Sequence, residues 1–520
     1  MSKNGICLVG AALLCAASGP LSTFAQPSEL SITSPGNGSH EGNSVITDDA
    51  GFIYLTGQHQ TARFEDGIRF AELFDERVTV IGRTDYFLAK FGPDLSPVWI
   101  KAAGSDQFDF GTVVRIAPNG DVIVTGAYQG TMDFHGQELP HSGRSDSFIA
   151  RYNNEGTLLW VRTINGAEDV IIDGLTLDAE GQIYVSGRLS HLATFGELEI
   201  GARFQRRAFL SKLSSGGEFL YSKVVTNTSD SGAVVVHAAH DGKLYLGGTY
   251  AANESGVFIA AYTLDGTESF LHVFTGGSGD EISDIELGSD GKLYVCGRFG
   301  GQTLDLNGVL LTNQSTFFSG FVARLNTSGE AEWGQIMGDR GIQLALDSNN
   351  TVFVGGYYQE ASNLVAGIPL NNAGRLDAFV SSLSSDGETK WAQGYSSDSN
   401  DLTRTVTLDR DGALIFAGEA FHTAFDIDSL SGSVFLAKTA SLASNPPTES
   451  PTPNITISWD TGSIELSWDQ TAEGFSVEAT ASLSTPFADA SPFLEAVAGQ
   501  ANRFKVSADT DSLFFRLSKP

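Results

Sequence analysis

A series of carboxylates that recurs along the chain provides the first candidate chemistry. Carboxylate oxygens are the ligands that Ca²⁺ prefers, so a ring of them could hold this ion or a cationic ligand. An aspartate in an Asp-x-Gly turn, however, also accepts bonds from the backbone N–H groups of its own turn. We expect the second role, because a residue repeated in a repeated turn first indicates a repeated local function. The candidates are Asp109, Asp173, Asp230, Asp280, Asp339 and Asp401, with Glu41 in the seventh corresponding place.

Histidine and cysteine side chains are weaker candidates for metal or redox chemistry. Five histidines fall in predicted loops at irregular spacing, which is typical of ordinary exposed residues rather than of metal ligands. They are His59, His135, His141, His191 and His422. Cys296 occupies a place that Gly, Ala, Ser or Thr holds in the other repeats described below, so that place is tightly packed. We expect a buried and unreactive thiol there.

No local motif assigns a reaction to the chain. The sequence lacks the HExxH and GxSxG patterns, the phosphate-binding loop GxxxxGK[ST] and paired CxxC spacings. We therefore expect no catalytic residue and no resident cofactor, with calcium at the acidic positions as the one exception left open.

The elements that position these residues are repeats. One stretch, GFIYLTG in its first copy, recurs seven times, with successive copies 49 to 69 residues apart. The copies begin at Gly51, Gly120, Gly181, Gly242, Gly291, Asn350 and Gly412. Most follow a polar turn such as DDAG, in which Gly accepts a positive φ and Asp bonds the turn backbone, so the pattern predicts a β-hairpin. A second marker such as Phe-Leu-Ala-Lys and then a strand with a large aromatic residue follow, which predicts four strands in each repeat.

The last repeat lacks a fourth strand, and the N-terminal segment supplies a matching one. After FLAK at Phe435–Lys438 the chain enters a Pro-rich stretch, whereas ELSITSPGNG, which begins at Glu29, aligns with the fourth strand of the other repeats. We therefore expect Glu29–Ser34 to pair with the strand at Val434–Lys438. This pairing would close a ring and remove two exposed sheet edges.

The repeated markers, taken in order, resemble the bacterial seven-bladed β-propeller repeat family over about residues 27–439. The resemblance implies an all-β, seven-bladed β-propeller closed by an N-terminal strand, and it implies frequent export. It brings no agreed activity and no catalytic motif. The third repeat departs from the pattern, because Arg207 stands where Asp85 and Asp146 stand in the first two repeats.

The chain divides into four regions by composition. Residues 1–25 are typical of a secretory signal, with Lys3 ahead of the apolar run Ile6–Ala17. The propeller takes 26–439, and a linker rich in Pro, Ser and Thr takes 440–454. Residues 455–520 alternate apolar and polar side chains, which predicts a small antiparallel β-sandwich. The ending FFRLSKP resembles a module common at the C-termini of exported bacterial proteins.

Charge and cysteine content limit the partners. The 520-residue chain has a formal net charge of −31, and loss of Lys3 with the signal leaves 30 basic against 62 acidic groups, or −32. Such acidity argues against nucleic acid and anionic membrane surfaces as partners. Signal cleavage would leave Cys296 as the only cysteine, so we expect no internal disulfide. No later apolar run is long enough to span a bilayer.

Together these observations favour a secreted, periplasmic or cell-surface monomer that binds a protein or a polysaccharide and catalyses nothing. The loops between second and third strands vary in length, and variable loops on a rigid scaffold commonly carry specificity. We expect that face to be the partner surface, and we expect replacement of the loop Phe64–Arg83 to spare folding. The alternative is a secreted hydrolase or lyase with its site at the mouth of the propeller channel.

Overall fold

The computed structural model describes most of the repeat region and short strands beyond it. The described residues are 30–33, 40–60, 63–65, 68–74, 76–203, 205–225, 231–238, 241–251, 255–277, 279–315, 317–359, 364–420 and 433–441, and seven strands between 456 and 518. Every regular element among them is a β-strand, so the described chain is all-β. Contacts divide the chain into two units, Thr23–Ala443 on one side and Met1–Ser22 with Ser444–Pro520 on the other. No helix in the described part of the chain could cross a membrane.

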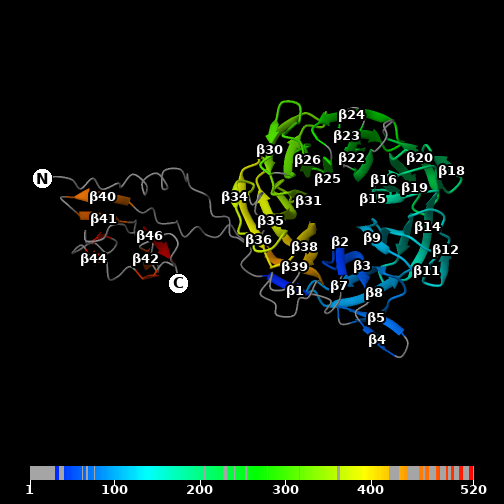
Figure 1. The fold of residues 1–520 in the computed structure, drawn as a ribbon, viewed down its shortest axis with the longest axis horizontal. Helices are drawn as coiled ribbons and strands as arrows, with labels where there is room; N and C mark the ends of the chain where they lie inside the picture. The colour runs from blue at the N-terminus through cyan, green and yellow to red at the C-terminus, as the bar shows by residue number, and fades with distance from the viewer. Residues whose placement is uncertain are drawn as a thin grey trace. The chain divides into compact units, whose positions relative to one another are not determined.

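Antiparallel sheets of consecutive strands build the larger unit, one from each repeat (Figure 1). We name each sheet by its first strand, which is also its innermost strand. The β2 sheet contains β2 (His40–Thr47), β3 (Ile53–Gln60), β7 (Thr84–Phe91) and β8 (Pro97–Ala103). The β9 sheet contains β9 (Asp109–Ile116), β10 (Val122–Tyr128), β13 (Asp146–Tyr152) and β14 (Leu158–Gly166). The β15 sheet contains β15 (Val170–Leu177), β16 (Ile183–Leu189), β19 (Arg207–Leu213) and β20 (Phe219–Val224). The β21 sheet contains β21 (Gly232–Ala238), β22 (Lys243–Ala251), β23 (Ser255–Thr263) and β24 (Glu268–Thr275). The β25 sheet contains β25 (Glu281–Leu287), β26 (Leu293–Phe299), β29 (Ser319–Leu325) and β30 (Ala331–Ile336). The β31 sheet contains β31 (Arg340–Leu346), β32 (Val352–Tyr358), β35 (Asp377–Leu383) and β36 (Thr389–Tyr395).

The remaining sheet joins the two ends of the repeat region. It contains β37 (Leu402–Leu408), β38 (Ala413–Ala420) and β39 (Ser433–Ser441), and its outer strand is β1 (Leu30–Thr33). In the antiparallel register Leu30 lies opposite Thr439 and Thr33 lies opposite Leu436. The predicted pairing of the N-terminal segment with the last repeat is confirmed. The strand β39 extends to Ser441 and so includes the first two residues assigned to the linker.

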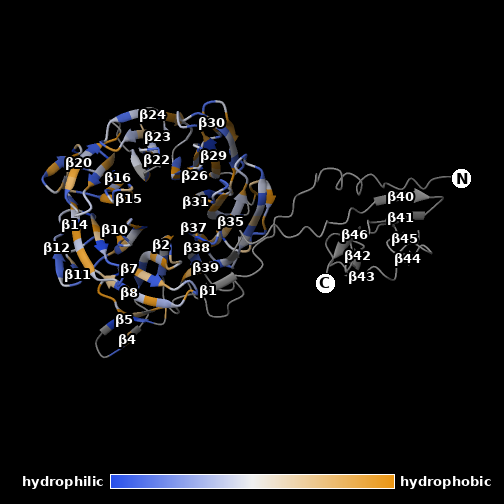
Figure 2. Ribbon diagram, turned by 180° about the vertical axis from the view of Figure 1, so that it is seen from behind, coloured by the Kyte–Doolittle hydropathy of each residue, from blue (hydrophilic) through white to orange (hydrophobic). Residues whose placement is uncertain are grey.

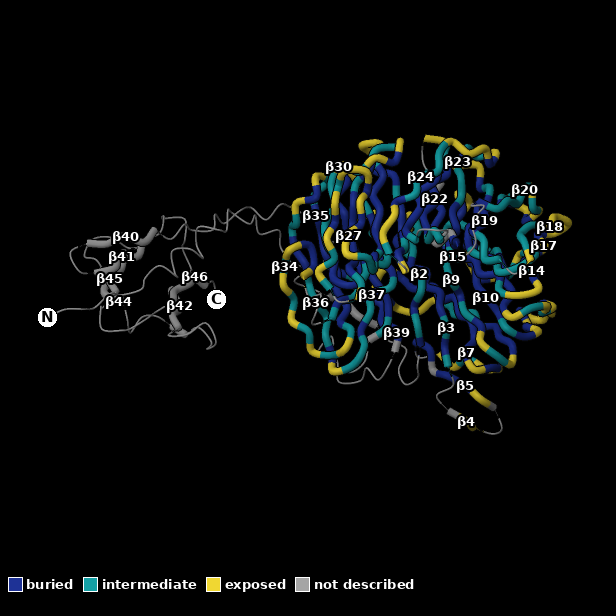
Figure 3. Tube along the Cα trace, turned by 45° about the horizontal axis from the view of Figure 1, so that its top comes forward, coloured by how far each residue is buried: buried dark blue, intermediate teal, exposed yellow. Residues whose placement is uncertain are grey.

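The sheets stand around a common axis in the arrangement of a β-propeller (Figures 1 and 2). Each inner strand contacts the inner strand of the next sheet, from β2 through β9, β15, β21, β25 and β31 to β37, and β37 in turn contacts β2. Buried residues follow the strands, and exposed residues gather at the turns (Figure 3). Apolar side chains between adjacent sheets therefore form the core, as in the cluster that joins Val45 and Leu55 to Ile415 and Leu436.

The basic residue of the second marker links neighbouring sheets. It stands on the third strand and donates to a backbone carbonyl in a turn of the next sheet. The bonds join Lys90 to Asn154 at 3.3 Å, Arg151 to Ser215 at 2.6 Å, Lys212 to Leu264 at 3.3 Å, Arg324 to Ser385 at 2.7 Å and Lys438 to Pro93 at 3.0 Å. The last bond connects the β37 sheet to the β2 sheet, so the same device acts where the two ends of the ring meet.

The aromatic residue of the third marker serves the same interface. A Cβ atom added at Gly156 would lie 3.0 Å from the ring of Trp99, and one added at Gly217 would lie 3.2 Å from the ring of Trp160. Both glycines also have a positive φ, of 78° and 87°. Only glycine meets both demands without strain, which explains why a turn glycine recurs in step with the aromatic residue.

Most loops between second and third strands are folded hairpins. Their strands are β4 (Arg63–Glu65), β5 (Ile68–Leu73) and β6 (Glu76–Thr79); β11 (Met132–Phe134) and β12 (Gln137–Leu139); β17 (Ala193–Phe195) and β18 (Leu198–Ile200); β27 (Thr303–Asp305) and β28 (Leu310–Thr312); and β33 (Leu364–Val365) and β34 (Ile368–Pro369). The β17 strand pairs with β14 of the preceding sheet, where Ile164 lies opposite Phe195. Isolated bridges join Asp133 to Gly104 and Val365 to Met337 in the same way.

These hairpins correct the expectation that the variable loops are free to change. In the segment Phe64–Arg83, the side chains of Phe70, Leu73 and Phe74 are 5%, 0% and 1% exposed. Leu73 and Phe74 belong to the core shared by the first and last repeats. This burial argues against the prediction that the loop can be replaced without effect on folding, because replacement would remove part of that core.

The smaller unit contains two short antiparallel sheets. One has the order β40 (Thr456–Asp460), β41 (Ser463–Ser467), β45 (Arg503–Val506) and β44 (Leu494–Ala496). The other has the order β43 (Ala488–Asp489), β42 (Ser476–Thr480) and β46 (Phe514–Ser518). The predicted signal at 1–25 and linker residues 442–454 lie outside the described residues.

Candidate functional site

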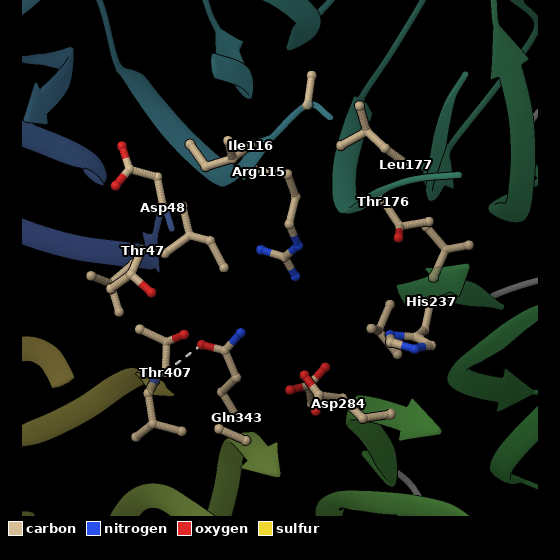
Figure 4. A pocket seen from close by; sticks show the side chains of 18 of the residues that line it. Thr47, Asp48, Arg115, Ile116, Thr176, Leu177, His237, Asp284, Gln343 and Thr407 are labelled. Carbon is tan, nitrogen blue, oxygen red and sulfur yellow. Dashed lines mark hydrogen bonds between the residues drawn. The ribbon is translucent and has the colours of Figure 1, made fainter. Parts of the chain in front are cut away.

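A cavity of about 630 Å³ opens on the ring axis where the inner strands reach their hairpin turns. Every one of the inner strands β2, β9, β15, β21, β25, β31 and β37 contributes to its lining. Figure 4 shows Arg115, Gln343, Asp284 and His237 pointing into this space from different sheets. We call this region the channel mouth.

Two successive positions of each inner strand differ in how much the residue type varies between repeats. The first position faces the packed interior of each sheet pair and always carries an aliphatic side chain, at most 2% exposed. Its residues are Val45, Val114, Leu175, Val236, Ile285, Leu344 and Val406. The next residue points to the other face of the strand and lines the cavity in each sheet. Its residues are Ile46, Arg115, Thr176, His237, Glu286, Ala345 and Thr407, so this position differs in almost every repeat.

Arg115 extends from β9 toward the axis without a close acidic partner. Its Nη1 atom donates to the carbonyl oxygen of Val114 at 2.9 Å. Among the described residues, no carboxylate lies within 4.0 Å of its guanidinium. Burial lowers the pKa of Arg115, while the charges of Asp284 and Glu286 oppose that shift. An arginine remains charged under such a shift, so the mouth holds a fixed cation with several unused N–H donors.

Two carboxylates of β25 face the same space. Asp284 is 5% exposed and accepts from the backbone N–H groups of Ile285 at 2.9 Å and Leu344 at 3.0 Å. Burial raises the pKa of Asp284, and the Leu344 N–H group and Arg115 oppose the shift. Burial and the neighbouring Asp284 also raise the pKa of Glu286. Titratable groups with shifted pKa values that converge in a cavity are a common mark of a functional site.

Polar side chains of the inner strands, including Asp284 and Gln343 of the lining, also hold the ring together. In four places a side chain on one inner strand accepts from the backbone N–H of the next. The bonds run from Val114 to Ser44 Oγ at 3.3 Å, from Leu344 to Asp284 Oδ2 at 3.0 Å, from Val406 to Gln343 Oε1 at 3.2 Å and from Val45 to Thr405 Oγ1 at 2.9 Å. Asp284 and Gln343 therefore have a structural role, and a backbone hydrogen bond from Leu346 of β31 opposes the rise in the pKa of Glu286, whereas Arg115 lies outside this series.

The predicted acidic positions bind their own loops. Asp109 accepts from the N–H groups of Ser105 at 2.5 Å and Gln129 at 3.4 Å. Asp280 accepts from Gly277 at 2.6 Å and Gly300 at 2.8 Å, and Asp401 from Ser397 at 2.7 Å. Burial raises the pKa of Asp109 and Asp280, and these backbone bonds oppose the shift. The turn-capping role is confirmed at these three aspartates.

Two of the other acidic candidates lie inside inner strands and do not share that place. Asp173 lies inside β15 and pairs with Arg188. Glu41 lies within 3.4 Å of Arg404. Asp339 directly precedes β31, as Asp280 and Asp401 precede β25 and β37, and it is 5% exposed. Asp230 lies outside the described residues. No group of three or more His, Cys, Asp or Glu in the described part of the chain could hold a metal ion; calcium binding stays a prediction.

The histidines that the sequence placed in loops differ in their burial and in their partners. His59 is fully buried in β3, so the prediction of an exposed loop residue is wrong for it. Burial, with a further contribution from His40, lowers the pKa of His59 to about 3. His135 bonds the hydroxyl of Tyr152 at 2.9 Å, and His141 lies 3.1 Å from Asp146. His191 is half-buried, and His422 lies outside the described residues.

Cys296 is fully buried on β26, as predicted. Burial raises the pKa of its thiol well above the ordinary value. The thiol is therefore protonated and lacks the thiolate form that reacts with oxidants or metals.

Comparisons with known proteins assign no activity to the chain. No family model matches it. The regulatory protein FlaEY of Caulobacter vibrioides is 26% identical over 207 residues, which are 37% of this chain and 21% of that protein, so the chain spans about a fifth of that relative.

Among solved structures, virginiamycin B lyase from Staphylococcus aureus has a TM-score of 0.42 at 11% identity, over 79% of this chain and 99% of that one. The WD40 domain of Neurospora crassa Pan2 has a TM-score of 0.43 at 11% identity, over 80% and 97%. At these scores and identities the likeness gives no information about activity or ligand.

The residues of the channel mouth were missed in the sequence because no motif contains them. Arg115, His237 and Glu286 stand inside strands rather than in loops. A signal was nevertheless present. When the repeats are aligned on the turn glycine, the position after the constant aliphatic residue changes in type from Arg to Thr, His, Glu and Ala.

Proposed function

We propose that this chain is an exported, seven-bladed β-propeller protein that binds a protein or polysaccharide partner and catalyses no reaction. Its place of action is outside the cytoplasm, secreted, periplasmic or at the cell surface. The ring serves as a rigid scaffold, and the channel mouth, rather than the loops between second and third strands, is the recognition site.

One observation carries this proposal: a cavity-lining position that differs from repeat to repeat inside an otherwise regular ring. Packing requires an aliphatic residue at the preceding position in every repeat. Nothing in that packing requires Arg115 in one sheet and Glu286 in another. An arginine removed from water without a close acidic partner costs stability, so its presence with carboxyl groups in one cavity favours a ligand that uses them.

The lining offers few kinds of nucleophile. Among its described residues there is no cysteine, serine or lysine, which leaves its carboxylates, threonines and His237 as the groups that the alternative of a hydrolase would need. The hydroxyl of Thr47 in the lining donates to the carbonyl oxygen of Leu408 at 3.0 Å.

Retention of the full chain on isolated cell envelope and on extracellular polymer from a bacterial culture tests the proposal. The variant Thr407→Trp places a large side chain in the cavity and should abolish retention. Val98→Trp is the matched control, because Val98 is 51% exposed on the outer strand β8 and the same bulk there faces solvent. Equal retention of both variants would rule out the channel mouth.

The same preparation separates binding from catalysis. The wild-type protein should bind its polymer without shortening it. Release of fragments from a glycan or ester, lost in Glu286→Gln, would instead establish the alternative of a secreted hydrolase or lyase.

A further inference from the structure

Polar groups of complementary type face each other across the channel mouth. Arg115 comes from β9 and Glu286 from β25, and two inner strands, β15 and β21, lie between these two along the ring. Arg115 presents donors only, and the carboxyl groups of Asp284 and Glu286 offer acceptor oxygens. Charges in a low-dielectric cavity act strongly on whatever enters. An anionic ligand group would be repelled by the carboxylates of the lining, which include Asp48, Asp49 and Asp284, and a cationic group would be repelled by Arg115.

A neutral hydroxyl group satisfies both sides at once. It accepts a hydrogen bond from a guanidinium and donates one to a carboxylate. The threonines Thr47, Thr176 and Thr407 add hydroxyl groups around the same cavity. A ligand with many hydroxyls and no net charge therefore matches the pattern of donors and acceptors in the lining.

We infer that the channel mouth binds the end of a neutral saccharide chain, whose hydroxyls accept from Arg115 and donate to Glu286. This inference rests on the proposed function and names its ligand class. The cavity volume of about 630 Å³ falls within the roughly 300–1,000 Å³ of pockets that enclose small ligands. It is therefore a site for a few sugar units rather than for a long segment of chain.

Two further observations favour a neutral saccharide over other partners. The chain has a formal net charge of −31, which opposes the approach of acidic polysaccharides. The lining contains no Phe, Tyr, Trp, Leu or Met other than Leu177. Protein interfaces concentrate their energy in buried aromatic and large apolar anchors, and the mouth offers little surface to receive one.

Titration calorimetry of the full chain with three sets of oligosaccharides tests the inference. The probes are neutral glucan and mannan fragments, uronic acid fragments, and chitosan fragments with free amino groups. We expect at least one neutral set to bind and both charged sets to bind more weakly. Arg115→Gln and Glu286→Gln should each weaken binding of the neutral ligand about tenfold, since a hydrogen bond to the ligand is lost in each case.

Glu155→Gln supplies the matched control. It removes the same charge from an exposed turn of the β9 sheet and should leave saccharide affinity unchanged. Thermal unfolding of all three variants shows whether any loss of affinity comes from loss of fold.

The contrary outcomes are distinct. Preferred binding of uronic acid fragments that depends on Arg115, or of chitosan fragments that depends on Glu286, would overturn the neutral class. Absence of binding to every saccharide, with envelope retention still lost in Thr407→Trp, would overturn the ligand class while leaving the proposed function in place. Retention that survives Thr407→Trp would instead overturn the proposed function.

Discussion

The inner strands carry charged residues at both ends, but only at one end do the arginines form close ion pairs with carboxylates. Where the strands begin, arginines and carboxylates lie in contact across sheets. Arg340 is 2.7 Å from Glu281 of the preceding sheet, and Arg404 of the β37 sheet contacts Glu419 and lies 3.4 Å from Glu41 of the β2 sheet. Where the strands end, Arg115 has no carboxylate within 4.0 Å among the described residues.

The arginines at the start of the strands therefore stabilise the contact between sheets, whereas the arginine at the channel mouth is available to a ligand. A paired arginine at the start of the strands links two neighbouring sheets, and removing it leaves its partners without compensation. An unpaired arginine at the channel mouth contributes no such link. The two ends therefore respond in different ways to the same substitution.

Loss of the N-terminal strand should have the largest effect, since it acts on the ring that holds both ends. Removal of residues 26–39 leaves β39 with an unpaired edge, which invites pairing between molecules. We expect aggregation or loss of a cooperative unfolding transition, observed by size-exclusion chromatography and calorimetry. The chain that lacks only residues 1–25 is the control, and it should remain monomeric. A monomeric, equally stable chain without residues 26–39 would show that β1 is dispensable.

Substitution of the paired arginine should give the next largest effect. Arg404→Gln leaves Glu41 and Glu419 facing each other without a cation, and we expect a loss of about 1–3 kcal/mol in the free energy of unfolding. The upper end of the range for buried pairs is discounted because the Arg404 side chain is 31% exposed.

Arg115→Gln at the other end should change the free energy of unfolding by less than about 1 kcal/mol. Denaturant titration of both variants makes the comparison directly. Equal losses of unfolding free energy in Arg404→Gln and Arg115→Gln would show that the two ends of the inner strands do not differ in this respect.

Acid should weaken the end where the strands begin through His59. The pKa of His59 is lowered to about 3 in the folded chain from an ordinary value of 6.5, so the unfolded chain binds the proton first as pH falls. Stability from this group is complete above about pH 6.5 and is lost toward pH 3, by about 1.4 kcal/mol per pH unit. His59→Phe, which keeps a ring beside Phe87, should lose less stability than the wild type between pH 6.5 and 4.5. Parallel losses in both proteins would assign the acid sensitivity to other groups.

The smallest effect should come from removal of divalent cations. Because Asp109, Asp280 and Asp401 already bind backbone N–H groups, we expect the melting temperature to be the same with and without chelator. A lower melting temperature in chelator, diminished in Asp280→Asn, would place a cation at these positions.

Turn chemistry and the strand period allowed much of the fold to be predicted. Gly51, Gly120 and Gly181 all have a positive φ at the hairpin turns, as the sequence pattern indicated. The pairing of Leu30–Thr33 with the last repeat could be predicted because a missing strand and an extra strand are both visible in the sequence. The buried state of Cys296 followed from the small residues at the matching places.

The candidate site could be predicted only in part. The acidic residues repeated with the turns, and the repetition correctly indicated a local backbone role for Asp109 and Asp280. His59 could not be recognised as buried, because its burial depends on His40 and Phe87 in neighbouring strands rather than on its own sequence neighbours. The hairpin that buries Phe74 likewise could not be told from a free loop.

The sequence by itself determined the strands, the turns and the joining of the chain's two ends, because these depend on φ, on side-chain alternation and on the local Asp and Gly residues. Only the tertiary structure decided which side chains meet on the axis. Arg115 and Glu286 are separated by 171 positions in the chain, and nothing local links them. They share a cavity because a ring places one position of every inner strand around a common axis, so residues remote in sequence become neighbours through geometry alone.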